Sequence, residues 1–237
     1  DIEIDNALDI SLQDAYGATG ISAVVLDDES GTPRSVSVLN RADIAMNNLD
    51  ETVTDERATF RNRAISVEVA PGLSSTIDFV NEGNISLIED APQDRGRAPG
   101  LPPGNPPDIQ GYNTDSAISI LLPGGTHSVD FFNAGDIDVQ TTIYDVNRDD
   151  YYFALRVAAI RIDAREGGTA GANFDAFTFR NTGRITGTYD ASFTAPVIAV
   201  NGGLANVDGV YSFINDGEID IVAGDAIGIG GGALGTY

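Results

Sequence analysis

The 237-residue sequence predicts an all-β fold, a parallel β-helix (β-solenoid) of about six irregular coils with loop insertions. Two short motifs alternate along the chain, and both place apolar residues at every second position, as a strand with one buried face does. No segment shows a sustained apolar pattern at i, i+3 and i+4, so helices should be scarce. Short strands at a repeating interval are typical of a solenoid or a propeller.

The first motif reads apolar-x-apolar-x-Asn-x-small-x-Ile-x-apolar. It occurs at residues 2–12, 36–46, 77–87, 129–139, 177–185 and 211–221. The small position is Gly in the four later copies, whereas the first two copies have Leu8 and Ala42 there. Because the same frame returns so often, the motif predicts one repeated structural unit.

The Asn of this motif favours a parallel β-helix over a propeller. Asn81 has the same parity as the apolar Phe79 and Ile85, so its amide should point inward or lie at a corner. An inward amide is costly unless it is hydrogen-bonded, and stacking identical Asn side chains from successive coils supplies those bonds. The predicted structural Asn ladder consists of Asn40, Asn81, Asn133, Asn181 and Asn215. The Gly two residues later is expected to allow a sharp corner with positive φ.

The second motif is a short strand that usually begins with Ala and continues as Ile-x-Val or Ile-x-Ile. It occurs at residues 64–67, 117–120, 159–162, 197–200 and 226–229, with a looser copy at 20–23. The chain from this motif to the next Asn is nearly constant in length, whereas the chain after the Asn varies. We therefore expect the insertions in one half of the unit. The largest is a Pro-rich loop insertion over residues 89–113, either a solvated loop or a contact loop for a neighbouring subunit or receptor.

Together, the Phe-x-Asn-x-Gly-x-Ile and Ala-Ile-x-Val motifs resemble the passenger repeats of bacterial autotransporters and related secreted right-handed parallel β-helix proteins. The resemblance covers nearly the whole chain and rests on structural residues. It implies a right-handed β-helix at the cell surface or in the medium, often an adhesin or the scaffold of one, and it implies no catalytic residue. We expect residues 1–237 to form a single β-helix domain that is a segment of a longer chain.

The composition argues against several other functions. The chain has 36 acidic and 13 basic residues, a formal net charge of -23 and a pI near 4.1, which opposes binding to nucleic-acid phosphates. With no Cys and one His, it has no disulfide, no thiol chemistry and no Cys/His zinc site. No apolar run reaches the about 18 residues that a membrane-spanning helix needs.

One acidic segment has a spacing that resembles the oxygen ligands of a calcium loop. Its candidate ligands are Asp145, Asn147, Asp149 and Asp150. The segment lacks the Gly and the Glu that such loops place further along, so a solvated acidic turn is the competing interpretation. Calcium is the one cofactor that the sequence suggests.

A carbohydrate-active β-helix enzyme, either a polysaccharide hydrolase or a lyase, is the alternative function. A hydrolase of this kind needs two facing carboxylates, and the 36 acids of the chain single out no pair. His127 follows the turn at residues 123–126 and has no Ser or Asp partner near it in sequence, so we expect it on the surface of that turn. The sequence therefore predicts no catalytic residue and no enzyme.

The sequence favours an extracellular structural or adhesive module, secreted or displayed at the cell surface, that acts as a stiff scaffold. A self-assembling surface-layer or filament subunit would share this fold. The expected partners are other copies of the chain or the rest of a longer parent chain, together with a surface glycan or a protein receptor. Acids at outward strand positions, such as Asp78, Asp130 and Glu218, should coat the rod with negative charge.

Overall fold

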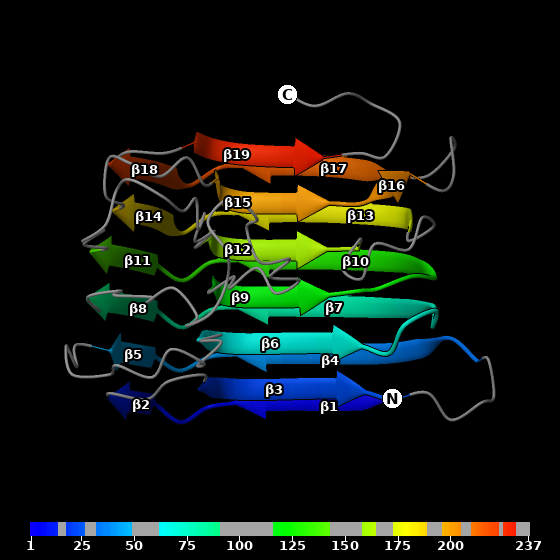
Figure 1. Cartoon of the computed structure of the whole chain (residues 1–237), viewed down its shortest axis with the longest axis horizontal. Coiled ribbons are helices and arrows are strands. Elements are labelled where there is room, and N and C mark those ends of the chain that lie inside the picture. Colours follow the sequence, from blue (N-terminus) through cyan, green and yellow to red (C-terminus); the bar gives the residue numbers. More distant parts are fainter. Residues whose placement is uncertain are drawn as a thin grey trace, which may run out of the picture.

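The computed structural model describes residues 1–13, 18–26, 32–48, 62–90, 116–142, 158–164, 173–188, 196–204, 210–222 and 225–230. Within these ranges the chain forms strands and no helix, and therefore no helix that is long and apolar enough to cross a membrane. The strands lie in three sheets, which we call sheets A, B and C. Figure 1 shows the strands of each sheet stacked one above another from the N-terminal to the C-terminal end of the chain.

Sheet A contains β1 (Ile2–Asn6), β4 (Arg34–Asn40), β7 (Ser75–Asn81), β10 (Thr126–Asn133), β13 (Asn173–Asn181), β16 (Gly203–Leu204) and β17 (Tyr211–Asn215). Sheet B contains β2 (Ile10–Gln13), β5 (Ile44–Asn48), β8 (Ile85–Asp90), β11 (Ile137–Thr142), β14 (Arg184–Thr188) and β18 (Glu218–Val222). Sheet C contains β3 (Thr19–Val25), β6 (Arg63–Val69), β9 (Ser116–Leu121), β12 (Ala158–Asp163), β15 (Pro196–Asn201) and β19 (Asp225–Gly230).

All neighbouring strands in the three sheets pair in parallel. β1 pairs with β4, β2 with β5 and β3 with β6, and this pattern continues along the described chain. The chain thus passes through sheets A, B and C in turn and then begins again, which is the arrangement of a β-solenoid. We call one such passage, for example β7, β8 and β9, a coil. The predicted all-β fold of stacked parallel strands is confirmed.

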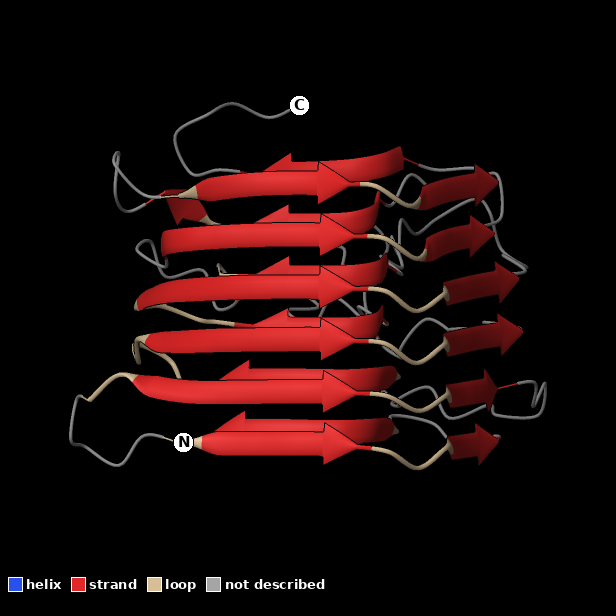
Figure 2. Ribbon diagram, turned by 180° about the vertical axis from the view of Figure 1, so that it is seen from behind, coloured by secondary structure: helices blue, strands red, loops and turns tan. Residues whose placement is uncertain are grey.

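Each coil has separate strands in sheets A and B because the first motif bends after its Asn. In the coil of β7, β8 and β9, Asn81 ends the sheet A strand and Ile85 begins the sheet B strand. Figure 2 shows the short turns that join these two sheets. The second motif forms the sheet C strand, and the longest segments outside the described residues, such as 91–115, fall between sheets B and C. Glu89 and Asp90 belong to β8, so they are strand residues and not part of the predicted loop insertion; the rest of that insertion, up to 113, lies outside the described residues.

The interior is filled by apolar rows that run along the stack. Parallel pairing in register places Phe79 beside Phe131, Phe131 beside Phe179, and Phe179 beside Phe213. Their ring centroids lie 4.9, 5.0 and 4.4 Å apart with interplanar angles of 4°, 2° and 3°. This spacing matches the about 4.8 Å between paired strands, so the aromatic stack follows from the register of the backbone.

Sheet C differs from the expected strand with one buried face. The inward Ile118 and Ile120 of β9 are buried, and so are the outward Ala117, Ser119 and Leu121. On sheet A, by contrast, the outward Asp78 and Asp130 are exposed, as predicted. The outward face of sheet C is therefore buried as well as its inward face. The alternation of apolar and polar residues in the sequence does not reveal this second buried face.

Candidate functional site

The Asn side chains at the ends of the sheet A strands form a hydrogen-bonded ladder. The Nδ2 atom of Asn81 donates to Oδ1 of Asn133 over 2.8 Å and to the carbonyl oxygen of Gly83 over 2.9 Å. Corresponding Nδ2–Oδ1 bonds of 2.7–2.8 Å join Asn6 to Asn40, Asn40 to Asn81, Asn133 to Asn181, and Asn181 to Asn215. The structure thus brings all five of the predicted ladder residues together and adds Asn6.

The ladder satisfies every amide atom in its middle. Both hydrogens of Asn133 are donated, one to Asn181 and one to the carbonyl oxygen of Gly135, and its Oδ1 accepts from Asn81. Asn133 is 0% exposed, so an unsatisfied amide there would be costly. All the side-chain bonds run in the same direction along the stack, and aligned bonds of this kind strengthen one another.

The Gly of the first motif is required for a reason that differs from the predicted positive φ. Among the described glycines, positive φ occurs at Gly72, Gly124 and Gly125, and the motif glycines are not among them. A Cβ atom built on Gly135 would instead overlap the carbonyl oxygen of Gly83 in the preceding coil. The same overlap occurs between Gly183 and Gly135. The motif Gly therefore allows close stacking of backbones at the turn.

A second ladder, which the sequence motifs did not predict, runs along the outside of the same turn. The backbone N–H of Asn84 donates to Oδ1 of Asp43 over 2.9 Å, and the N–H of Asp136 donates to Oδ1 of Asn84 over 3.1 Å. Asp43 and Arg184 donate in the same way to Asp9 and Asp136, each over 3.1 Å. The sequence contains a signal for this second ladder. In the four motif copies that supply the acceptors, the residue directly before the motif Ile is Asp or Asn.

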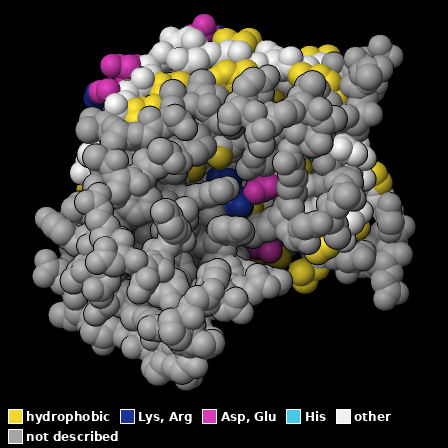
Figure 3. Space-filling view, turned by 45° about the horizontal axis from the view of Figure 1, so that its top comes forward, with side chains coloured by type: hydrophobic (Ala, Val, Ile, Leu, Met, Phe, Trp, Pro, Cys, Tyr) yellow, Lys and Arg dark blue, Asp and Glu magenta, His cyan; other side chains and the backbone are white. Residues whose placement is uncertain are grey.

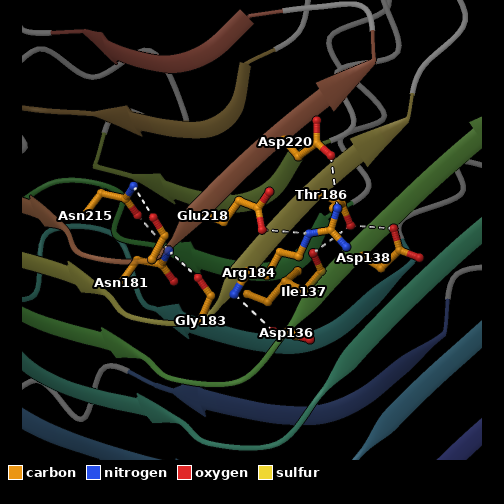
Figure 4. Close-up of polar contacts among 11 residues, drawn as sticks. Asp136, Ile137, Asp138, Asn181, Gly183, Arg184, Thr186, Asn215, Glu218 and Asp220 are labelled. Atoms are coloured by element: carbon orange, nitrogen blue, oxygen red, sulfur yellow. Dashed lines mark hydrogen bonds and ion pairs between the residues drawn. The ribbon is translucent and has the colours of Figure 1, made fainter.

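Arginine side chains link the outer coils of the described stack to their neighbours. Nε of Arg184 lies 3.3 Å from Oε2 of Glu218, and its Nη2 lies 3.0 Å from Oδ2 of Asp220 (Figure 4). At the other end, Nη1 of Arg41 lies 2.6 Å from Oδ2 of Asp5. These side chains are about half exposed, with Arg184 at 49%, so each pair contributes little stability in salt solution.

His127 is buried, which corrects the expectation of a surface position. Its Nε2 atom lies 2.6 Å from the carbonyl oxygen of Gly124, and its Nδ1 atom lies 2.9 Å from Oγ of Ser75 in the preceding coil. Because a carbonyl only accepts, Nε2 carries the hydrogen, and Nδ1 accepts from the Ser75 hydroxyl. Ser75 is 52 residues away from His127 in sequence, so no local pattern could have identified this contact.

Burial lowers the pKa of His127 below its ordinary value. Between this lowered pKa and the unfolded value of about 6.5, the unfolded chain binds a proton that the folded chain does not, so stability rises with pH. The contribution is complete above about pH 6.5 and is lost as the pH falls toward the lowered pKa. We expect urea unfolding at pH 7.5 and 5.5 to show a larger loss of stability for the parent chain than for His127→Gln. Equal losses would contradict this assignment.

Two buried serine hydroxyls on sheet C lack a hydrogen-bond partner within the described part of the chain. They belong to Ser116 and Ser119, which are 0% and 1% exposed. Ser119 lies in register with Ser66 on one side and with Arg161 on the other. Nη2 of Arg161 donates to Oδ2 of Asp163 over 2.8 Å. In Figure 3, a few basic and acidic side chains of the described residues are visible near the middle of the view.

Ser119→Ala should leave the free energy of unfolding unchanged or raise it by about 1 kcal/mol, because it removes a buried hydroxyl that has no partner among the described residues. Ser75→Ala is the matched control: this serine is also buried, but its hydroxyl is bonded to His127, so its loss should cost about 1 kcal/mol. Chemical denaturation of both variants measures the difference. A larger loss for Ser119→Ala than for Ser75→Ala would contradict the assignment.

The candidate calcium ligands Asp145, Asn147, Asp149 and Asp150 lie outside the described residues. In the part of the chain that the structure describes, no group of three or more His, Asp or Glu side chains is placed to hold a metal ion.

Comparison with known proteins does not assign the chain to a family. No protein-family model, no curated protein sequence and no solved structure matches the chain. The functional argument therefore depends on the contacts of the chain itself.

Proposed function

We propose that the chain is an extracellular structural or adhesive module, a right-handed parallel β-helix of about six coils that acts as a stiff scaffold, secreted or at the cell surface. The observation that carries this proposal is the ladder of side-chain amides, which continues from Asn6 to Asn215 without a missing bond. A stack in which each coil bonds to the next through its backbone and a side-chain amide, with stacked aromatic rings from Phe79 to Phe213, resists bending and local opening.

The positions of the insertions support a role of the chain in binding another molecule. The long segments at residues 49–61, 91–115 and 143–157 all leave from sheet B strands and return to sheet C strands. Because those strands are stacked, the attachment points lie above one another along one edge of the stack. A rigid body that carries variable segments along one edge is suited to binding a surface glycan or a protein receptor.

Two measurements on the producing cells and the purified chain test the proposal. Protease added to intact cells should cleave the protein, because a surface or secreted protein is accessible to it. Labelled chain should bind the surface it serves, and deletion of residues 92–107 should weaken binding while the melting temperature stays unchanged. Protection from protease in intact cells that becomes cleavage only after lysis would contradict an extracellular role.

The second candidate is a carbohydrate-active enzyme, and one observation favours it. Glu68 and Asp163 lie in one outward row of sheet C, separated by Leu121. Their strands are two spacings apart, about 10 Å, which is close to the carboxyl separation of inverting glycosidases. A screen of neutral and acidic glycans for cleavage products tests this candidate. Activity lost in both Glu68→Gln and Asp163→Asn would support it, and the absence of any product would remove it.

A further inference from the structure

One residue of the outer ladder lies in an acceptor sequence for N-linked glycosylation. The segment Asn84-Ile85-Ser86 has the form Asn-x-Ser, with a residue other than Pro in the middle. Of the 16 Asn residues in the chain, Asn84 is the one that has Ser or Thr two positions later. So short a motif defines a site only where the folded chain presents the Asn to solvent.

The fold places this motif on the outside of a bend. β7 ends at Asn81 and β8 begins at Ile85, so Asn84 is the last residue of the turn between sheets A and B. Asn84 is exposed, Ile85 is buried and Ser86 is half-buried. The amide of Asn84 and the hydroxyl of Ser86 therefore lie on the outward side, while Ile85 anchors the segment to the core.

The hydrogen bonds of Asn84 leave its side-chain nitrogen free. Its backbone N–H donates to Oδ1 of Asp43, and its Oδ1 accepts from the N–H of Asp136. No group in the described part of the chain accepts a hydrogen bond from its Nδ2. In the inner ladder, by contrast, Asn81 donates both of its Nδ2 hydrogens. The atom to which a sugar would be attached is therefore accessible at Asn84 and occupied at Asn81.

The neighbouring coils show which atoms of the motif the fold requires. The outer ladder uses only the side-chain oxygen of Asn84, because Asp43 and Asp136 accept the same bond with a carboxylate oxygen. Ser86 lies in register with Ala45 of the preceding coil, so a hydroxyl is not needed in that row either. Neither the amide nitrogen of Asn84 nor the hydroxyl of Ser86 has a structural role among the described residues.

We propose that Asn84 is glycosylated at Nδ2, a modification that goes beyond the scaffold function. The donor is a sugar activated as a glycosyl diphosphate, and a separate transferase catalyses the step. Nδ2 forms a bond to the anomeric carbon as the bond from that carbon to the diphosphate breaks. The diphosphate leaves with the electron pair, and Nδ2 loses one proton to a base of the transferase. The product keeps Oδ1, so the bond from the Asp136 N–H persists.

The attached sugar would project from an edge of the stack that does not carry the insertions. Asn84 lies where the chain passes from sheet A to sheet B, and Figure 2 shows these turns along one side of the stack. The long segments at residues 49–61, 91–115 and 143–157 connect sheet B to sheet C. Glycosylation at Asn84 is therefore compatible with binding through those segments.

Mass spectrometry of the protein isolated from the producing cells tests the proposal. Cleavage after Arg yields a peptide of residues 64–95, which contains two asparagines, Asn81 and Asn84. This peptide should carry the mass of a sugar, and fragmentation should place that mass on Asn84.

Two variants of the same residue separate the motif from the fold. Ser86→Ala should abolish the modification although Asn84 is intact, whereas Ser86→Thr keeps the acceptor sequence and should retain it. The outward row of Ser86 already contains Ala45 and Thr186 in other coils, so both variants should have the melting temperature of the unglycosylated parent.

Three outcomes overturn the proposal: no sugar on peptide 64–95, a sugar on Asn81 in place of Asn84, or equal modification of Ser86→Ala and the parent. Loss of the sugar from Ser86→Thr as well as from Ser86→Ala would also contradict it. An unmodified chain that protease cleaves on intact cells would remove this inference and leave the proposed function. A modified chain that is protected in intact cells would do the reverse.

Discussion

Asn133→Leu should lower the free energy of unfolding by about 3 kcal/mol or more. The substitution removes the two bonds that Asn133 donates and the one that it accepts. It leaves a hydrogen of Asn81, the Oδ1 of Asn181 and the carbonyl oxygen of Gly135 without a partner, and each unsatisfied buried group costs about 1–3 kcal/mol. Leucine has a similar volume, so the loss is a loss of hydrogen bonds and not of packing. Urea denaturation followed by circular dichroism measures it.

Asn215→Leu is the matched control, because Asn215 lies at the exposed end of the ladder. Water can replace its side chain as the partner of Asn181, so the cost should not exceed about 1 kcal/mol. A loss at Asn133 no larger than the loss at Asn215 would show that the ladder is not a source of stability.

Gly135→Ala should cost about 3 kcal/mol, the upper part of the range for overpacking. The new Cβ atom would overlap the backbone carbonyl oxygen of Gly83, which cannot move aside without displacing the neighbouring coil. Gly72→Ala is the control, since Gly72 has a φ of +84° and no atom lies within 4 Å of the position that its new Cβ would take. Its cost should be only the about 1–2 kcal/mol of a left-handed residue. A loss for Gly135→Ala no larger than the loss for Gly72→Ala would contradict close stacking of backbones as the reason for the motif Gly.

The strands and their parallel stacking could be predicted because the information is local. Alternation around Phe79 and Phe131 marks the buried face, and a polar residue of the same parity, such as Asn81, needs an identical neighbour to satisfy its amide. Repetition of the frame then implies that equivalent residues lie beside each other. The bend after the Asn was expected at the motif Gly, but Gly83 does not have the positive φ that was predicted for that corner.

Features that depend on the distance between coils could not be predicted. The role of Gly135 follows from how near the backbone of Gly83 lies, and a sequence does not contain that distance. The burial of His127 follows from contact with Ser75 in another coil. The outer ladder at Asp43, Asn84 and Asp136 did leave a signal, the acid or Asn before each Ile, but so acidic a chain makes that signal hard to recognise.

Hydrogen exchange of the Asn side-chain amides, followed by NMR, tests the ladder most directly. The Nδ2 hydrogens of Asn81, Asn133 and Asn181 are donated inside the stack and should exchange slowly in D2O. The Asn215 amide lies at the exposed end and should exchange much faster. Exchange of the Asn133 amide as fast as that of Asn215 would contradict a body held together by stacked amides.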